Sequence, residues 1–217
     1  MTKADHELAH SMRCIKHFSP NEQRYGIPRD ALYSISLKET GRKHSTKGAT
    51  IVWPWTANVK GKGYYFDTKG EAVHFVRSQL LRGVDSIDVG CMQVNLKAHP
   101  EAFRSVEDAL DPKTNVAYSA SFLRSKYEQL GSWHKAVAHY HSATPEHGVP
   151  YKNDVVKIAR NIDKYKDVFR KNRVRRELSN QYDLAHKPTA QERREVASRS
   201  KRYRSDMMVH VPRGARG

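Results

Sequence analysis

The chain lacks the segments that place a protein across a membrane or mark it for standard export. Its 217 residues contain no run of about 18 apolar residues, the length that a membrane-spanning helix needs. Residues 1–10 lack the apolar centre of a signal peptide. Three explanations stay open: a cytoplasmic location, a leader removed before this sequence begins, or another export route.

Cysteine is scarce. The sequence has two, Cys14 and Cys91, which permits one disulfide and equally permits two small buried thiols. Their spacing fits no zinc-binding pattern. His139, His141 and His147 are accompanied by no His-x-Glu or paired-cysteine motif. We therefore expect no metal site and no cofactor.

Acidic residues are outnumbered by basic ones. The chain has 39 Lys and Arg against 23 Asp and Glu, a net charge of +16, and residues 160–217 carry +10 of it. A protein of this charge is attracted to polyanions such as nucleic acid, anionic lipid or an acidic cell-wall polymer. The apolar pattern fades beyond Arg173. We therefore expect a domain over residues 1–172 and a basic tail over 173–217, disordered or partly helical at 190–204.

Apolar residues recur at helical spacing over most of the domain. The expected helices cover residues 4–18, 31–40, 69–81, 112–130, 133–141 and 151–171. Thr68 and Glu71 have the spacing of a capping box in front of the third helix. The predicted fold class is therefore mainly α, within the α+β class.

The pattern changes in the middle of the domain. Residues 50–59 and 64–66 are rich in β-branched and aromatic side chains, and residues 60–63 have turn chemistry. This predicts a small β-hairpin insertion, in which Pro54 would make the first strand an edge strand. The aromatic side chains of the hairpin either pack in the core, the commoner case, or offer a platform for sugar rings.

One carboxyl group stands out near the end of a mostly apolar helix. Leu32 and Ile35 face inward, and Glu39 follows one turn later, just before the helix stop at Gly41. Burial there would raise the pKa of the Glu39 carboxyl, as a general acid working near neutral pH requires. The alternative is an ordinary surface glutamate, and this helix alone does not decide between them.

A second stretch, residues 84–97, mixes apolar and polar residues closely. Gly90 gives the backbone freedom, while Gln93 and Asn95 supply amide groups. Without further information, this stretch is a buried loop or a short strand.

Five segments in this order resemble the SLT-type lytic transglycosylases, peptidoglycan-cleaving enzymes of the goose-type lysozyme superfamily. They are Tyr25 to Gly41 with Glu39-Thr40-Gly41, Val89 to Asn95, Asn115 to Leu123, Ala136 to Ala143, and Tyr151 to Val155. The resemblance covers about residues 10–165. Thr40, Cys91, His141 and Thr144 depart from the residues that are usual in the family.

The resemblance implies a lysozyme-like helical domain that acts on peptidoglycan glycan strands. Glu39 would protonate the glycosidic oxygen between N-acetylmuramic acid and N-acetylglucosamine. It would then accept the proton of the muramyl C6 hydroxyl, giving a 1,6-anhydro product. The insertion between Glu39 and Met92 resembles that of secretion- and flagellum-associated members. We therefore expect local wall opening or remodelling, a periplasmic or wall-associated location, a secretion or flagellar assembly as partner, and a monomer.

The resemblance also implies roles for residues around Glu39. Met92 and Gln93 would line the sugar subsites, Asn95 would orient its loop or the sugar, and Tyr140 would lie over the cleft and hydrogen-bond near Glu39. If the protein is exported, a disulfide between Cys14 and Cys91 would tie the N-terminal helix to the loop that contains Met92.

Other functions stay open. Asp85 and Asp88 are the nearest candidates for the second carboxylate of a hydrolytic muramidase on the same fold, although we interpret both as structural or cleft-lining. A non-catalytic module that binds the cell wall or another polyanion is a further alternative. The basic tail by itself predicts only non-specific contact with polyanions, because no nucleic-acid recognition motif accompanies it.

Overall fold

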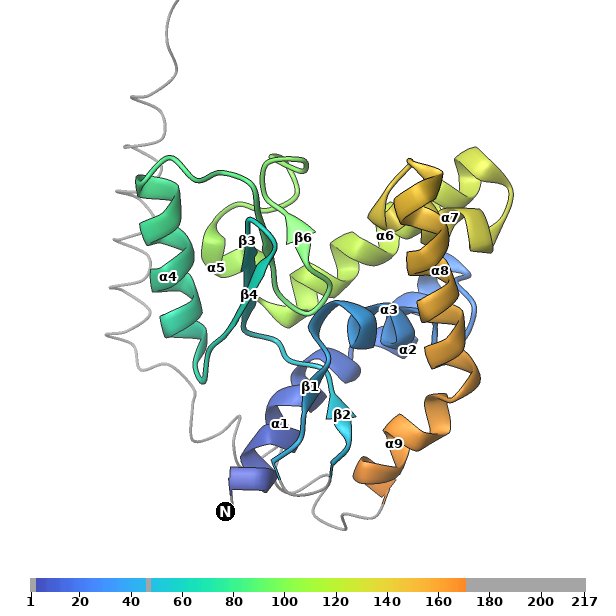
Figure 1. The fold of residues 1–217 in the computed structure, drawn as a ribbon, viewed down its shortest axis with the longest axis horizontal. Helices are drawn as coiled ribbons and strands as arrows, with labels where there is room; N and C mark the ends of the chain where they lie inside the picture. Colours follow the sequence, from blue (N-terminus) through green and yellow to red (C-terminus); the bar gives the residue numbers. More distant parts are fainter. Residues whose placement is uncertain (1–2, 46–47, 171–217) are drawn as a thin grey trace, which may run out of the picture. The chain divides into compact units, whose positions relative to one another are not determined.

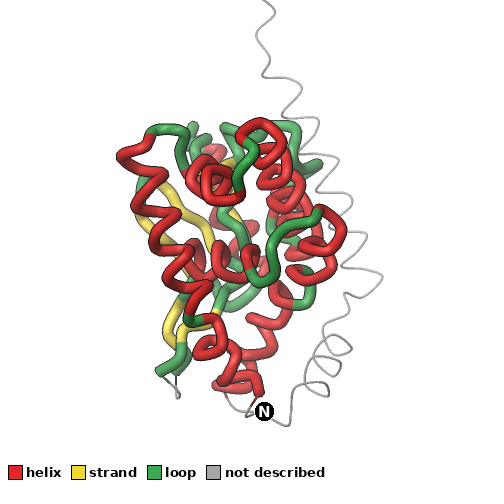
Figure 2. Tube along the Cα trace, turned by 90° about the vertical axis from the view of Figure 1, so that its right-hand side faces the viewer, coloured by secondary structure: helices red, strands yellow, loops and turns green. Residues whose placement is uncertain are grey.

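The computed structural model of the protein describes residues 3–45 and 48–170, and helices make up most of this part of the chain (Figures 1 and 2). The helices are α1 (Lys3–Ile15), α2 (Phe18–Tyr25), α3 (Ala31–Thr40), α4 (Lys69–Leu81), α5 (Val106–Ala109), α6 (Pro112–Leu130), α7 (Trp133–His141), α8 (Pro145–Arg160) and α9 (Ile162–Arg170). The strands are β1 (Arg42–Lys43), β2 (Thr50–Ile51), β3 (Thr56–Val59), β4 (Lys62–Tyr65), β5 (Ile87–Val89) and β6 (Val94–Asn95). The expected mainly α fold with a small β insertion is confirmed.

Helix α3 lies at the centre of the helical part. It packs against α2 and α8, and its side chains Leu32 and Ile35 are fully buried. Helix α6 packs against α1, α2 and α7, which extends the same apolar core. Helix α3 is therefore held from several sides, and its last turn carries Glu39.

Strands β4, β3, β5 and β6 form an antiparallel sheet in that order. Side chains alternate between the two faces of a strand. Ala57, Val59 and Val89 belong to the apolar core that includes α4 and α5, and α4 runs alongside the strands in Figure 1. Asn58 and Asp88 alternate with these residues, so the opposite face of the sheet is polar.

The hairpin differs from the sequence prediction. It joins β3 to β4, while Thr50–Ile51 pairs with Arg42–Lys43 in a separate two-stranded sheet. Pro54 lies between the two strands because it has no N–H for a ladder. Strand β3 pairs with β4 on one side and with β5 on the other, so it is an inner strand, and β4 lies at the edge of the sheet. The expectation of an edge strand before the turn is wrong.

Two helices that have a proline in the first turn, α2 and α8, were not predicted with these starts. Helix α2 is not among the expected helices, and Pro20 lies in its first turn, where the missing N–H costs nothing. Similarly, α8 starts at Pro145, where a loop was expected through Pro150. The single helix expected over 151–171 is divided at Asn161 into α8 and α9.

Other expectations are confirmed. Thr68 and Glu71 form the capping box of α4, and α6 and α7 have the predicted bounds. No helix within the described ranges 3–45 and 48–170 is long and apolar enough to cross a membrane. The tail predicted over residues 173–217 lies outside the described residues, and the domain boundary stays a prediction.

Candidate active site

Glu39 lies in the last turn of α3 and lines a cavity of about 360 Å³. The helix ends beside it at Gly41, whose N–H donates to the Leu37 carbonyl oxygen. A Cβ atom at position 41 would lie 2.3 Å from that oxygen, so only glycine fits there. The half-buried Glu39 side chain thus stands at a helix end with access to the cavity.

The surroundings of Glu39 favour its neutral form. Burial raises the pKa of its carboxyl to about 7, and the nearby Asp88 carboxylate acts in the same direction. A hydrogen bond from Tyr151 and the positive charge of Lys38 oppose this rise. Glu39 therefore holds a proton over part of the neutral range and can donate it to a bound molecule.

Tyr151 on α8 is the direct partner of Glu39. Its hydroxyl donates to Glu39 Oε1 over 2.5 Å. Tyr140 on α7, predicted to lie over the cleft and hydrogen-bond near Glu39, lines the same cavity and donates to the Met92 carbonyl oxygen over 2.8 Å. The tyrosine that bonds the carboxyl itself comes from α8 and was not predicted.

His141 lies beside the tyrosine that bonds Glu39. Its ring stacks on the Tyr151 ring with centroids 4.5 Å apart and an interplanar angle of 5°. Burial lowers the pKa of His141, assisted by Lys38 and His147 and opposed by Asp88. A neutral imidazole therefore covers the tyrosine that holds Glu39.

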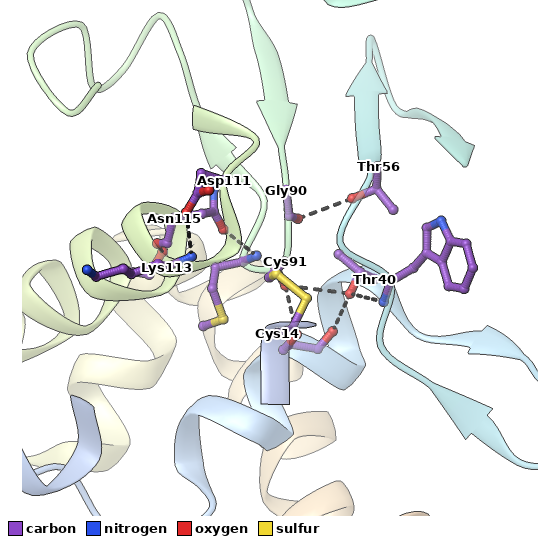
Figure 3. The surroundings of a disulfide bond; sticks show 12 residues. Cys14, Thr40, Thr56, Gly90, Cys91, Asp111, Lys113 and Asn115 are labelled. Carbon is purple, nitrogen blue, oxygen red and sulfur yellow. Dashed lines mark hydrogen bonds between the residues drawn. A yellow bond between two sulfur atoms is a disulfide. The ribbon is translucent and has the colours of Figure 1, made fainter. Parts of the chain in front are cut away.

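The turn that joins β5 to β6 closes one side of the cavity. Gly90 has φ +77°, and a Cβ atom at this position would lie 2.6 Å from Asn115 Nδ2. Asn115 donates to the carbonyl oxygens of Val89 and Ala109 and accepts from the Met92 N–H. Its side chain therefore fixes the turn from inside (Figure 3). No role was predicted for Asn115 from the sequence. The signal that points to it is an amide side chain among the apolar residues on the buried face of a helix.

The three residues expected to bind substrate from this turn have different positions. Met92 is fully buried in the core, so its side chain does not line sugar subsites, which corrects that expectation. Gln93 has φ 49°, lines the cavity and donates to Thr56 Oγ1 over 2.8 Å. Asn95 also lines the cavity. Its Oδ1 accepts from two backbone N–H groups of its own loop, and its Nδ2 donates to Asp88 Oδ1.

The two candidates for a second catalytic carboxylate, Asp85 and Asp88, differ in whether they reach the cavity. Asp85 is exposed and forms an ion pair with Lys97, outside the cavity lining. Asp88 lines the cavity together with Glu39. Burial raises the pKa of Asp88, while the hydrogen bond from Asn95 and the nearby His141 lower it. One cavity thus contains two carboxyl groups in different surroundings.

Cys14 and Cys91 are joined by a disulfide with an S–S distance of 2.09 Å, and both residues are fully buried. The bond ties the end of α1 to the turn between β5 and β6 (Figure 3). The Cys91 carbonyl oxygen accepts from Ser36 Oγ on α3. Thr40 Oγ1 bonds to the Ser36 carbonyl oxygen and accepts from the Trp53 N–H. Thr40 Oγ1 also lies 3.5 Å from the Cys91 carbonyl oxygen, so the end of α3 is joined both to the turn at Cys91 and to the segment at Trp53.

The cavity is polar and is lined by the carboxyl groups of Glu39 and Asp88 together with several amides and aromatic rings. No group of three or more His, Cys, Asp or Glu side chains is placed to hold a metal ion within the described part of the chain. A protein-family model described as the transglycosylase SLT domain matches residues 16–161, more than half of the chain. No curated protein and no solved structure matches the chain.

Proposed function

The chain belongs to the transglycosylase SLT domain family, and from this premise we propose that it cleaves the β-1,4 bond between N-acetylmuramic acid and N-acetylglucosamine with formation of a 1,6-anhydro end. The family consists of lytic transglycosylases that act on peptidoglycan. The observation that carries the proposal is the Glu39 carboxyl, which faces the cavity with its pKa raised to about 7.

In the first step, protonated Glu39 donates its proton to the glycosidic oxygen. The bond from this oxygen to muramyl C1 breaks, the N-acetylglucosamine side leaves as an alcohol, and positive charge develops at C1. The N-acetyl group of the same muramyl sugar stabilises this charge through its carbonyl oxygen. A second carboxylate is therefore not required at C1.

In the second step, Glu39 acts as a base. Its carboxylate accepts the proton of the muramyl C6 hydroxyl while the C6 oxygen bonds to C1. This closes the 1,6-anhydro ring without water and returns Glu39 to its protonated form. Between the steps the Tyr151 hydroxyl donates to the carboxylate, which stabilises the anion and holds its orientation.

Hydrolysis is the second candidate, and the position of Asp88 favours it. Asp88 lines the cavity with Glu39, and its carboxylate is oriented by Asn95. In that role it would accept a proton from a water molecule that attacks C1, and the product would be a reducing end. The two reactions share the first step and differ in the nucleophile.

Product analysis tests the proposal. Purified sacculi are incubated with the wild type, with Glu39→Gln and with Asp85→Asn, and the released muropeptides are identified by mass. We expect anhydro products from the wild type and from Asp85→Asn, whose carboxyl lies outside the cavity, and none from Glu39→Gln. If the wild type instead releases reducing ends, and a further variant, Asp88→Asn, does not, the enzyme is a hydrolase. Binding of the wild type to sacculi without release of any muropeptide would indicate a wall-binding module instead.

The biological setting is also proposed. The insertion between Glu39 and Met92 supports local wall opening for a secretion or flagellar assembly by a monomeric enzyme, and the disulfide supports a periplasmic or wall-associated location, since such bonds persist in oxidising compartments. Contact with polyanions is assigned to residues 173–217, which lie outside the described residues. A salt-sensitive DNA gel shift that survives deletion of residues 173–217 would contradict that assignment.

A further inference from the structure

One face of the four-stranded sheet carries a polar row that starts in the cavity and continues past it. Residues directly opposite each other on paired strands share a face. Asn95 is paired with Asp88, Asp88 with Asn58, and Asn58 with Gly63. The first three line the cavity with Glu39. Gly63 on the edge strand β4 extends the row by one strand spacing, about 4.8 Å.

Tyr65 lies on the same face of β4, two residues after Gly63. It is paired with Thr56, whose hydroxyl oxygen accepts from Gln93 Nε2 at the cavity wall. The Tyr65 ring comes within 3.9 Å of the position that a Gly63 Cβ atom would occupy. The ring therefore lies beside the open surface above Gly63, one strand beyond Gln93.

Tyr65 differs from the other aromatic residues of this segment in its exposure. Trp53 and Trp55 are 1% and 6% exposed, and Tyr64 and Phe66 pack against Phe75 of α4. The Tyr65 residue is 47% exposed. An exposed aromatic ring on an edge strand gains little from core packing, so its position is not explained by the fold.

The side chain of Arg42 supports this part of the surface. Its guanidinium carbon lies 4.1 Å from the Trp53 ring centroid and 6.0 Å from the Tyr65 ring centroid. Glu7 pairs with the guanidinium over 3.3 Å. The arginine is therefore fixed between a buried ring and an exposed one, which limits the motion of Tyr65.

We propose that Gly63 and Tyr65 form a sugar-binding subsite at the edge of the cleft, where the Tyr65 ring stacks on a pyranose of the glycan strand beyond the bond cleaved at Glu39. This inference rests on the proposed function, since it assumes a glycan in the cavity. The C–H groups on one face of a pyranose ring form an apolar surface that an aromatic ring covers. Gly63 leaves room for the sugar, and Asn58, whose Oδ1 accepts from the Gly61 N–H, offers its amide NH2 group to a hydroxyl or N-acetyl oxygen of the adjacent unit.

Binding to an inactive protein tests the subsite independently of the reaction. All variants carry Glu39→Gln, and β-1,4-linked N-acetylglucosamine oligomers of increasing length are titrated by calorimetry. We expect the parent to bind long oligomers more tightly than short ones. Tyr65→Ala should weaken binding of long oligomers about three- to tenfold and leave short ones unchanged. Tyr65→Trp should restore binding, and Gly63→Val should reproduce the loss with the ring still present.

The matched control is Leu81→Ala, which removes another exposed apolar side chain, 86% exposed at the end of α4. It should bind every oligomer as the parent does, and thermal unfolding checks that each variant is folded. Equal affinity of Tyr65→Ala and the parent for long oligomers overturns the subsite, and so does a parent that binds no oligomer or shows no dependence on length. Failure of the proposed function is recognised separately, because it appears as absent anhydro products from the active wild type.

Discussion

The Tyr151 hydroxyl donates to the Glu39 carboxylate across 112 residues of sequence. This hydrogen bond lowers the pKa of Glu39, and burial of the carboxyl raises the same pKa by more. These are the two largest of the contributions that place the pKa near 7, and the hydrogen bond can be removed without changing the fold around it.

Removal of the Tyr151 hydroxyl should raise the Glu39 pKa. In Tyr151→Phe the acid form of Glu39 persists to higher pH, so the alkaline limb of the pH–activity profile shifts upward. We expect kcat to fall about tenfold or more, because the carboxylate formed between the two steps loses its donor. The measurement is the release of muropeptides against pH. Tyr127→Phe, which removes a hydroxyl from a ring stacked on Trp133 outside the cavity, is the control. An unshifted alkaline limb would show that the bond does not set the pKa.

Glu39 should make the protein less stable as the pH rises. Its pKa is higher in the folded state than the ordinary 4.5, so the folded state binds the proton more tightly. The stabilisation is complete below about pH 4.5 and is lost between there and about pH 7. Glu39→Gln cannot ionise. We therefore expect the difference in free energy of unfolding between Glu39→Gln and the wild type to be about 3 kcal/mol larger, in favour of the variant, at pH 8 than at pH 4.

Urea unfolding of both proteins at the two pH values measures this difference. Asp85→Asn removes an exposed carboxyl and should show no comparable gain at high pH. If Glu39→Gln and the wild type lose stability in parallel between pH 4 and pH 8, the carboxyl is not held neutral by the fold.

Asn115 should be needed for the turn at Gly90. Asn115→Leu keeps most of the volume and leaves the carbonyl oxygens of Val89 and Ala109 and the Met92 N–H without their partner. Each buried polar group that loses its partner costs about 1–3 kcal/mol, so we expect a loss of about 3 kcal/mol or more in unfolding free energy. Asn153→Leu, at an exposed position of α8, should change it by less than about 0.5 kcal/mol. Similar urea midpoints for both variants would contradict a structural role of Asn115.

The disulfide between Cys14 and Cys91 should be present in protein purified without reductant. Alkylation followed by mass measurement should modify two thiols only after reduction and unfolding. The bond closes a loop with a sequence separation of 77 residues, so its loss should cost about 4 kcal/mol of unfolding free energy. Cys14→Ser combined with Cys91→Ser should unfold at the midpoint of the reduced wild type. Two alkylated thiols in unreduced, unfolded protein would rule out the bond.

Elements whose signals are local could be predicted from the sequence alone. Helix α6 begins at Asp111-Pro112 and ends at Gly131, and the capping box of Thr68 and Glu71 starts α4, because caps act within one turn. The helix that carries Glu39 did not single out this residue by itself, and the prediction came from the five segments that follow the order of the resembled family. Pro20 and Pro145 misled the prediction because a proline in a first turn and a proline that ends a helix have the same local sequence signal.

Which side chains meet in the cavity depends on how the helices and strands pack together. Tyr151 rather than Tyr140 reaches Glu39 because α8 packs against α3, and Asn115 holds the turn at Gly90 because α6 packs beneath it. Strand register put Tyr65 on the face that Asn58 and Asp88 share, while the neighbouring Tyr64 faces the core. Such contacts join residues far apart in sequence, and their partners depend on packing geometry that no short segment of the chain encodes.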